Sequence, residues 1–143
     1  MLKRKVYADL LKWKKEANGK ALCIIGARQI GKTTLIREFG KNEYEHFAEL
    51  NFVTDQRAAD IFNDKLTAET IITNLTAYLQ TPLEPGKTLI LFDEVQECPR
   101  VRSAIKFLVE DGRFDYIESG SLLGVRYKDV TSYPVGFEQI LPM

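Results

Sequence analysis

The chain has 143 residues, 45% of them hydrophobic, which is enough for one buried core and too little for two independent ones. A single domain spanning residues 1–143 is therefore expected. Its 20 basic and 20 acidic residues cancel, so the overall charge favours neither nucleic acid nor a membrane surface as a partner. The two cysteines match neither a disulfide framework nor a zinc spacing, and no apolar run approaches the roughly 20 residues of a membrane span. We expect a cytoplasmic protein with no membrane segment.

The first twenty residues hold seven basic and two acidic side chains. Apolar residues from Val6 to Ala17 recur at helical spacing, and "NG" at 18–19 is a stop signal, so an amphipathic helix is predicted at 4–17 with Trp13 in the core. Basic side chains on such a helix usually form a solvated face. We interpret them in that way here.

The rest of the chain alternates between strand and helix patterns. Strands are predicted at 21–25, 46–52, 88–92, 114–119 and 136–143. Helices are predicted at 33–40 with Gly40 as its cap, after Asp55, after Thr67, and from Pro99 to Gly112. This alternation favours an α/β fold with a parallel sheet, helices on both faces and right-handed crossovers.

Residues 26–33, between the first predicted strand and the second predicted helix, follow the pattern G-x-x-x-x-G-K-[ST] of the Walker A motif. Glycines allow the backbone N–H groups to approach and surround phosphate oxygens, and the helix adds its positive N-terminal end. Lys32 is expected to reach the β- and γ-phosphates, and the Thr33 hydroxyl to bind Mg²⁺. The expected nucleotide-binding residues are Gly26, Ala27, Arg28, Gln29, Ile30, Gly31, Lys32, Thr33 and Thr34. The alternative is a chance match, in which Gly31 forms a turn and Lys32 is solvated.

A second stretch, "TLILFDE" at 88–94, has the form of a Walker B segment. Asp93 would lie at the carboxyl end of its strand, where ligands of such sheets bind, and is predicted to hold Mg²⁺ together with Thr33. Glu94 is predicted to orient a water molecule toward the γ-phosphate, which favours hydrolysis over transfer to a small acceptor.

The segments "GARQIGKTT", "LFDEVQECP" and "IESGSLLG", in this order, resemble the AAA-type ATPase domain of a group of bacterial and archaeal predicted ATPases. Members of that group commonly carry a further C-terminal domain of unknown function. The resemblance implies a P-loop three-layer fold with a mostly parallel five-stranded sheet in the order 5-1-4-3-2. It also implies a polar sensor at the tip of the fourth strand, with Ser119 as first choice and Ser121 as second. A helical lid and the C-terminal domain would normally follow, so we expect the chain to be a truncated domain.

Other polar residues have less definite roles. Arg28 would contact phosphate or a neighbouring subunit, or is simply solvated, and His46 is interpreted as structural. Finger residues that reach a neighbour's nucleotide could come from Arg100, Arg102, Arg113 and Arg126, none of which is assigned.

The patterns predict hydrolysis of Mg·ATP with Lys32 and Glu94 as catalytic residues, and the resemblance adds Ser119 as the third. The main alternative is a nucleotide-dependent binding module with little turnover, whose protein or DNA partner binds through the missing C-terminal region. The resemblance also leaves oligomerisation open. A small-molecule kinase is a weaker reading, and ATP is favoured over GTP because no N-K-x-D signature follows.

Overall fold

The computed structural model describes residues 2–16, 20–26, 31–121 and 138–142. Its centre is a five-stranded sheet with the order β2-β3-β4-β1-β5, the order predicted above, and all four strand pairings are parallel. The strands are β1 (Ala21–Gly26), β2 (His46–Asn51), β3 (Thr88–Asp93), β4 (Asp115–Ser121) and β5 (Glu138–Pro142). The predicted α/β fold with a parallel sheet is confirmed.

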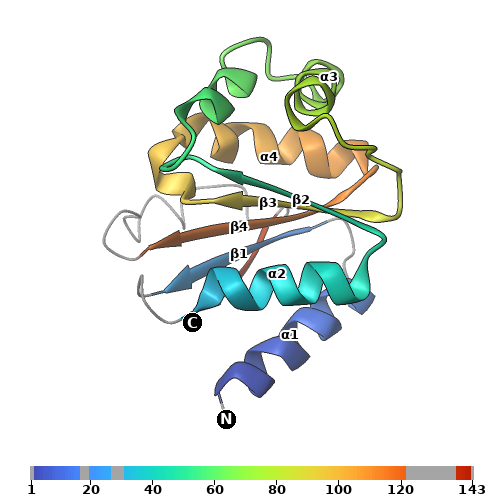
Figure 1. Cartoon of the computed structure of the whole chain (residues 1–143), viewed down its shortest axis with the longest axis vertical. Helices are drawn as coiled ribbons and strands as arrows, with labels where there is room; N and C mark the ends of the chain where they lie inside the picture. Colours follow the sequence, from blue (N-terminus) through green and yellow to red (C-terminus); the bar gives the residue numbers. More distant parts are fainter. Residues whose placement is uncertain (1, 17–19, 27–30, 122–137, 143) are drawn as a thin grey trace.

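Helices cover both faces of this sheet (Figure 1). The helices are α1 (Leu2–Glu16), α2 (Lys32–Glu43), α3 (Ala68–Leu79) and α4 (Pro99–Asp111), with short 3₁₀ helices η1 (Gln56–Phe62) and η2 (Val95–Glu97). The predicted caps Asp55 and Thr67 accept backbone hydrogen bonds at the starts of η1 and α3, and Gly112 ends α4 at φ 76°. The sequence patterns did not predict η2.

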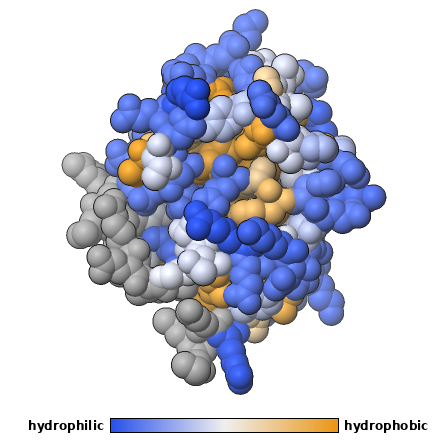
Figure 2. Space-filling model, viewed as in Figure 1, coloured by the Kyte–Doolittle hydropathy of each residue, from blue (hydrophilic) through white to orange (hydrophobic). Residues whose placement is uncertain are grey.

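Alternating side chains of β3 pack into two different hydrophobic clusters, one on each face of the sheet. Leu89 and Leu91 pack with α1 and α2, whereas Ile90 and Phe92 pack with η1, α3 and α4. Trp13, predicted to be core, is 2% exposed. The outer surface is mostly hydrophilic on the face in Figure 2. No helix in the described ranges is long and apolar enough to cross a membrane.

One capping prediction is wrong. The helix α2 continues past Gly40 to Glu43, and its C-terminal cap is Tyr44. Gly40 is buried within the helix, and a Cβ built on it would lie 2.2 Å from Cδ1 of Phe47 on β2. The glycine therefore serves the close packing of α2 against β2 and does not end the helix.

Candidate functional site

The two sequence motifs meet at the carboxyl ends of β1 and β3. Gly26 ends β1, and Gly31 precedes α2 with φ 72°, a left-handed conformation that glycine adopts without strain. Asp93 ends β3 and is the register partner of Ser119 on β4. Leu91 and Ile117, which precede Asp93 and Ser119 by two residues in their strands, pack with α1 and α2. Because side chains two residues apart in a strand point to the same face, Asp93 and Ser119 lie on the face that α2 covers.

The contact that joins the motifs is a hydrogen bond from the Thr33 hydroxyl to Oδ2 of Asp93, at 3.1 Å. The same oxygen accepts a bond from Nδ2 of Asn51 at 3.3 Å, and Oδ1 accepts the Glu94 N–H at 3.0 Å. Three donors therefore fix a carboxylate that is only 3% exposed. Burial raises the pKa of Asp93, and the nearby Glu94 charge adds to the increase, while the bond from Thr33 opposes it. A buried carboxylate of this kind is stabilised by a cation.

Asn51 is a site residue that the sequence patterns missed. It is the last residue of β2 and the register partner of Asp93. Its Oδ1 accepts the N–H groups of Val53 and Thr54, at 2.9 and 3.0 Å, in a turn that orients the amide nitrogen toward Asp93. An asparagine at a strand end is a usual turn residue, so only the pairing of β2 with β3 identifies this one.

Lys32, the first residue of α2, is 5% exposed. Within the described ranges it forms no ion pair or hydrogen bond through its side chain. A buried ammonium group without an anionic partner is costly, and an anion bound beside it would offset that cost. The position therefore suits a phosphate group.

Glu94 follows Asp93 in a left-handed conformation, φ 59° and ψ 48°. A non-glycine residue in this region costs on the order of 1–3 kcal/mol, and such strain is concentrated at functional sites. Its Oε1 accepts a hydrogen bond from Nε2 of Gln96 at 3.2 Å. The strained backbone holds the Glu94 side chain next to the buried Asp93.

Ser119 is fully buried, and its hydroxyl has no hydrogen-bond partner among the residues described. It is the register partner of both Asp93 and Ile24, so it lies between the strands that end in the two motifs. The loop residues 27–30 lie outside the described residues, as do the side chain of Ser121 and the whole of Arg126.

The other three arginines that were candidates for an arginine finger form hydrogen bonds or ion pairs within the domain. Arg102 is 5% exposed, and its Nη1 lies 3.7 Å from Oε1 of the buried Glu118. Arg100 donates to the carbonyl oxygens of Phe62 and Asp64, and Arg113 pairs with Asp111. Arg102 is therefore enclosed within the domain.

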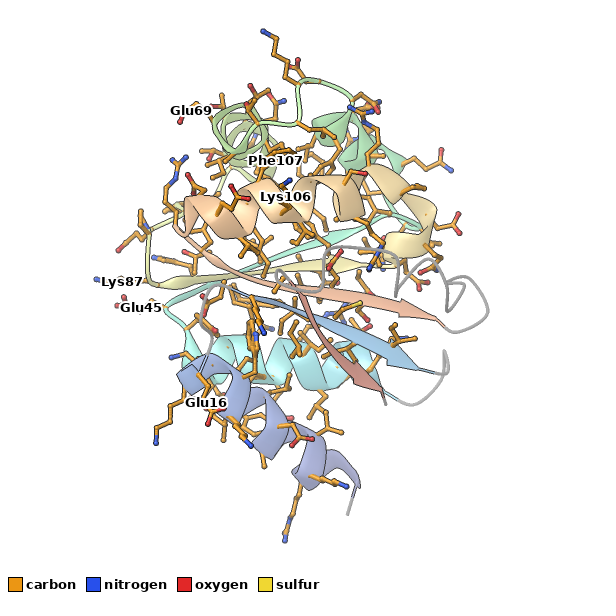
Figure 3. The ribbon with its side chains drawn as sticks, turned by 180° about the vertical axis from the view of Figure 1, so that it is seen from behind. Glu16, Glu45, Glu69, Lys87, Lys106 and Phe107 are labelled. Carbon is orange, nitrogen blue, oxygen red and sulfur yellow. The ribbon has the colours of Figure 1, made fainter. Side chains whose placement is uncertain are left out.

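His46 lies at the other end of β2 from the site. Its Nε2 is 3.1 Å from Oε1 of Glu84, and Lys87 pairs with Glu84 and with Glu45, the latter at 3.3 Å. Figure 3 shows Lys87 beside Glu45 at this end of the strands. The cluster joins the starts of β2 and β3, which agrees with the structural role expected of the histidine.

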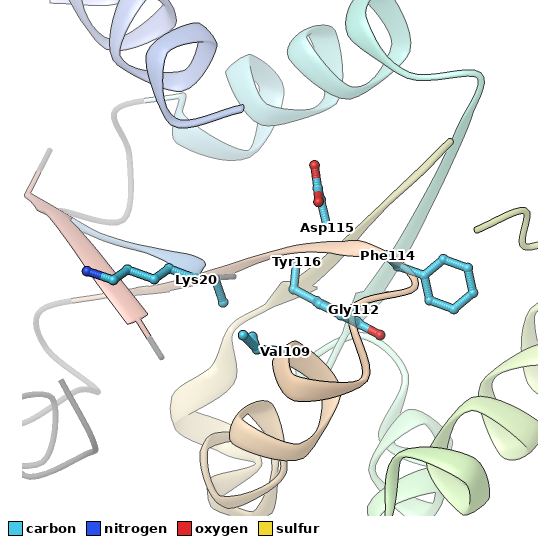
Figure 4. A pocket seen from close by; sticks show the side chains of 7 residues that line it. Lys20, Val109, Gly112, Phe114, Asp115 and Tyr116 are labelled. Atoms are coloured by element: carbon cyan, nitrogen blue, oxygen red, sulfur yellow. The ribbon is translucent and has the colours of Figure 1, made fainter. Parts of the chain in front are cut away.

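A cavity of about 140 Å³ lies at the amino ends of β1 and β4, between Lys20, Tyr116 and the end of α4 (Figure 4). The Tyr116 hydroxyl is buried and has no hydrogen-bond partner in the described part of the chain. Burial raises the pKa of Tyr116. None of the residues predicted for the site lines this cavity.

Comparisons with known proteins concern the family and the fold of the chain. Residues 18–143 match the model of a family described as AAA domain. Among solved structures, the chain resembles PCH-2 of C. elegans with a TM-score of 0.57 at 13% identity, covering 99% of this chain and 42% of that one. It resembles a RuvB variant of Thermotoga maritima with a TM-score of 0.55 at 18% identity, covering 97% of this chain and 43% of that one. It also resembles Drosophila ORC bound to AT-rich DNA and Cdc6, with a TM-score of 0.54 at 10% identity, covering 98% and 53%.

At these identities the likeness to solved structures shows a shared fold. The chain spans only 42% to 53% of the length of the three structures. No curated protein sequence matches the chain.

Proposed function

The chain belongs to the AAA domain family, whose members are P-loop nucleotide-binding ATPase modules, and from this premise we propose that it binds and hydrolyses Mg·ATP. The observation that carries the proposal is the 3.1 Å hydrogen bond between Thr33 and Asp93. It joins two motifs that are 60 residues apart in the sequence, at the sheet edge where α/β proteins bind ligands. We propose residues 26–34 as the Walker A loop and 88–94 as the Walker B segment.

Each side chain then has a distinct task. Lys32 and the backbone N–H groups around Gly31 bind the phosphates, and the cost of burying the Lys32 ammonium is offset by their negative charge. Glu94 accepts a hydrogen bond from water and orients it for attack on the γ-phosphorus. Ser119 donates its hydroxyl to the γ-phosphate or to the water, which would satisfy a buried group that has no partner among the described residues.

The donor set beside Lys32 fits Mg²⁺. This ion prefers oxygen ligands, and the Thr33 hydroxyl and the Asp93 carboxylate are both oxygen donors on adjacent elements. The buried Asp93 carboxylate gains stability from a cation, which is consistent with its raised pKa. When bound, Mg²⁺ neutralises charge on the phosphate oxygens. Asn51 and the Glu94 N–H hold Asp93 in place.

A nucleotide-dependent binding module is the second candidate, favoured by one surface. The outer side of α1 exposes the side chains of Arg4, Lys5, Lys12 and Lys15, with Leu11 40% exposed among them. Such a stripe could bind an anionic partner such as DNA, while ATP selects the competent conformation. A DNA affinity that falls steeply with salt, and falls again on charge reversal of these four residues, would support this candidate. We also propose a protein partner, self-association and a cytoplasmic location.

The experiment that tests hydrolysis measures phosphate release from Mg·ATP by the parent chain and by Glu94→Gln, with nucleotide affinity recorded in the same samples. We expect turnover by the parent, and a Glu94→Gln variant that binds ATP normally with kcat lower by about 100-fold. A parent that binds ATP without turnover would contradict hydrolysis and favour the binding module. Phosphate transfer to a small acceptor in place of water would instead indicate a kinase.

A further inference from the structure

The segment between β3 and α4 holds a second amide side chain against the proposed site. The 3₁₀ turn η2 is fixed at both ends, since the N–H of Glu97 binds the Glu94 carbonyl and the N–H of Cys98 binds the Val95 carbonyl, each at 3.0 Å. Val95 is 1% exposed and anchors the turn in the core. Gln96 therefore projects from a rigid backbone two residues after Glu94.

The Gln96 side chain donates a hydrogen bond from Nε2 to Oε1 of Glu94 at 3.2 Å. An ionised carboxylate can only accept, so the amide nitrogen is the end of Gln96 that faces it. The amide oxygen of Gln96 is buried and has no hydrogen-bond partner among the described residues. Because no described residue binds that oxygen, the bond to Glu94 is the contact that orients the amide.

We propose that Gln96 is a positioning residue for Glu94: its amide donates to Oε1 of Glu94 and so helps to fix the direction of the carboxylate that orients water. This inference rests on the hydrolytic function proposed above. A glutamate side chain has three rotatable bonds, and restricting them costs conformational entropy. Because the hydrogen bond from Gln96 restricts them before ATP binds, this cost does not add to the barrier for hydrolysis. The left-handed backbone of Glu94 sets the origin of the side chain, and the bond from Gln96 restrains its carboxylate end.

A substitution to methionine tests the hydrogen bond with little change in shape. Gln96→Met keeps an unbranched side chain of similar length and removes the donor, and we expect kcat to fall about tenfold. The dissociation constant for Mg·ATP should stay within about twofold of the parent value, because Gln96 acts on the water-orienting group and not on the phosphates. Gln96→Glu places a like charge beside Glu94 and should lower kcat further.

Glu97→Met is the matched control. Glu97 lies on the same turn, its side chain is exposed, and the variant should retain the parent kcat. Circular dichroism and thermal unfolding of each variant show whether η2 and α4 remain folded.

A double-substitution cycle separates positioning from a general structural effect. If Gln96 acts through Glu94, then Gln96→Met should have little further effect on single-turnover hydrolysis in the Glu94→Gln background. The inference is overturned if Gln96→Met keeps the parent kcat, raises kcat, changes only the affinity, or lowers the rate tenfold in both backgrounds. A parent that does not hydrolyse ATP overturns the proposed function itself, and with it this inference, which is a different result from an active parent that is indifferent to Gln96.

Discussion

The Thr33 hydroxyl lies 3.1 Å from the Asp93 carboxylate, so the start of α2 and the end of β3 share one polar contact. Each of these residues also belongs to one of the two motifs of the proposed nucleotide site. The contact fixes the relative position of both before any ligand binds, and such preorganisation reduces the entropy cost of binding.

Replacing Thr33 by valine keeps the branched shape and removes the hydroxyl. We expect the affinity for ATP in the presence of Mg²⁺ to fall by about tenfold, because one metal donor is lost and Asp93 loses a bond. ATP affinity measured in EDTA should change little. Titration calorimetry with and without Mg²⁺ distinguishes these effects, and Thr73→Val, an exposed threonine on α3, is the control. Equal losses with and without Mg²⁺ would contradict a metal-binding role.

Asn51 offers a test of how Asp93 is held. Asn51→Asp keeps an oxygen that can accept the N–H groups of Val53 and Thr54, but it replaces the donor to Asp93 with a second carboxylate. Loss of such a supporting partner typically costs roughly 10- to 100-fold in metal affinity or activity. We expect ATP turnover to require a correspondingly higher Mg²⁺ concentration. An unchanged Mg²⁺ dependence would show that the Asn51 contact does not matter for Asp93.

The sequence was sufficient for the order of the elements and for the two motifs, because these depend on local signals. A run of aliphatic residues before Gly26 and another before Asp93 identify buried strands without any knowledge of the tertiary contacts. The contacts of Asn51 with Asp93 and of Gln96 with Glu94 were not predictable in this way. They follow from the pairing of β2 with β3 and from the turn η2, which are products of the folded structure.

Gly40 shows the same limit inside a helix. A glycine near the end of a helical pattern usually marks a cap, but tertiary packing against Phe47 decides its role here. We expect Gly40→Ala to destabilise the protein by about 1–3 kcal/mol, despite the better helix propensity of alanine, because the added methyl overlaps the ring.

Urea unfolding measures this effect. A second substitution, Phe47→Leu, removes the ring and should make Gly40→Ala less costly than in the parent. If Gly40→Ala raises the stability in the parent background, then the close contact between α2 and β2 does not constrain this position.

The end of α4 supplies a prediction on pH. The hydrogen-bonded Arg113 guanidinium lowers the pKa of Asp111 below its usual value. A lowered carboxyl pKa stabilises the fold at pH values above the ordinary pKa of about 3.9, and this contribution is lost as the pH falls through the lower, folded-state pKa. Asp111→Asn should therefore be less stable than the parent at pH 7, by less than about 1 kcal/mol, with a difference that shrinks in acid. Glu110→Gln, at an exposed neighbour, is the control, and a difference that is constant from pH 7 to pH 2 would contradict the ion pair.

The central claim is that Lys32 and its neighbours bind the phosphates of ATP, and direct binding tests it most simply. The measurement is the equilibrium affinity for Mg·ATP of the parent chain and of Lys32→Met, which keeps the length of the side chain and removes its charge. We expect the parent to bind and the variant to lose affinity by about 100-fold, or about 2.8 kcal/mol, because the attraction between the ammonium and the phosphates is lost. Equal affinities, or no binding by a folded parent chain, would contradict the account.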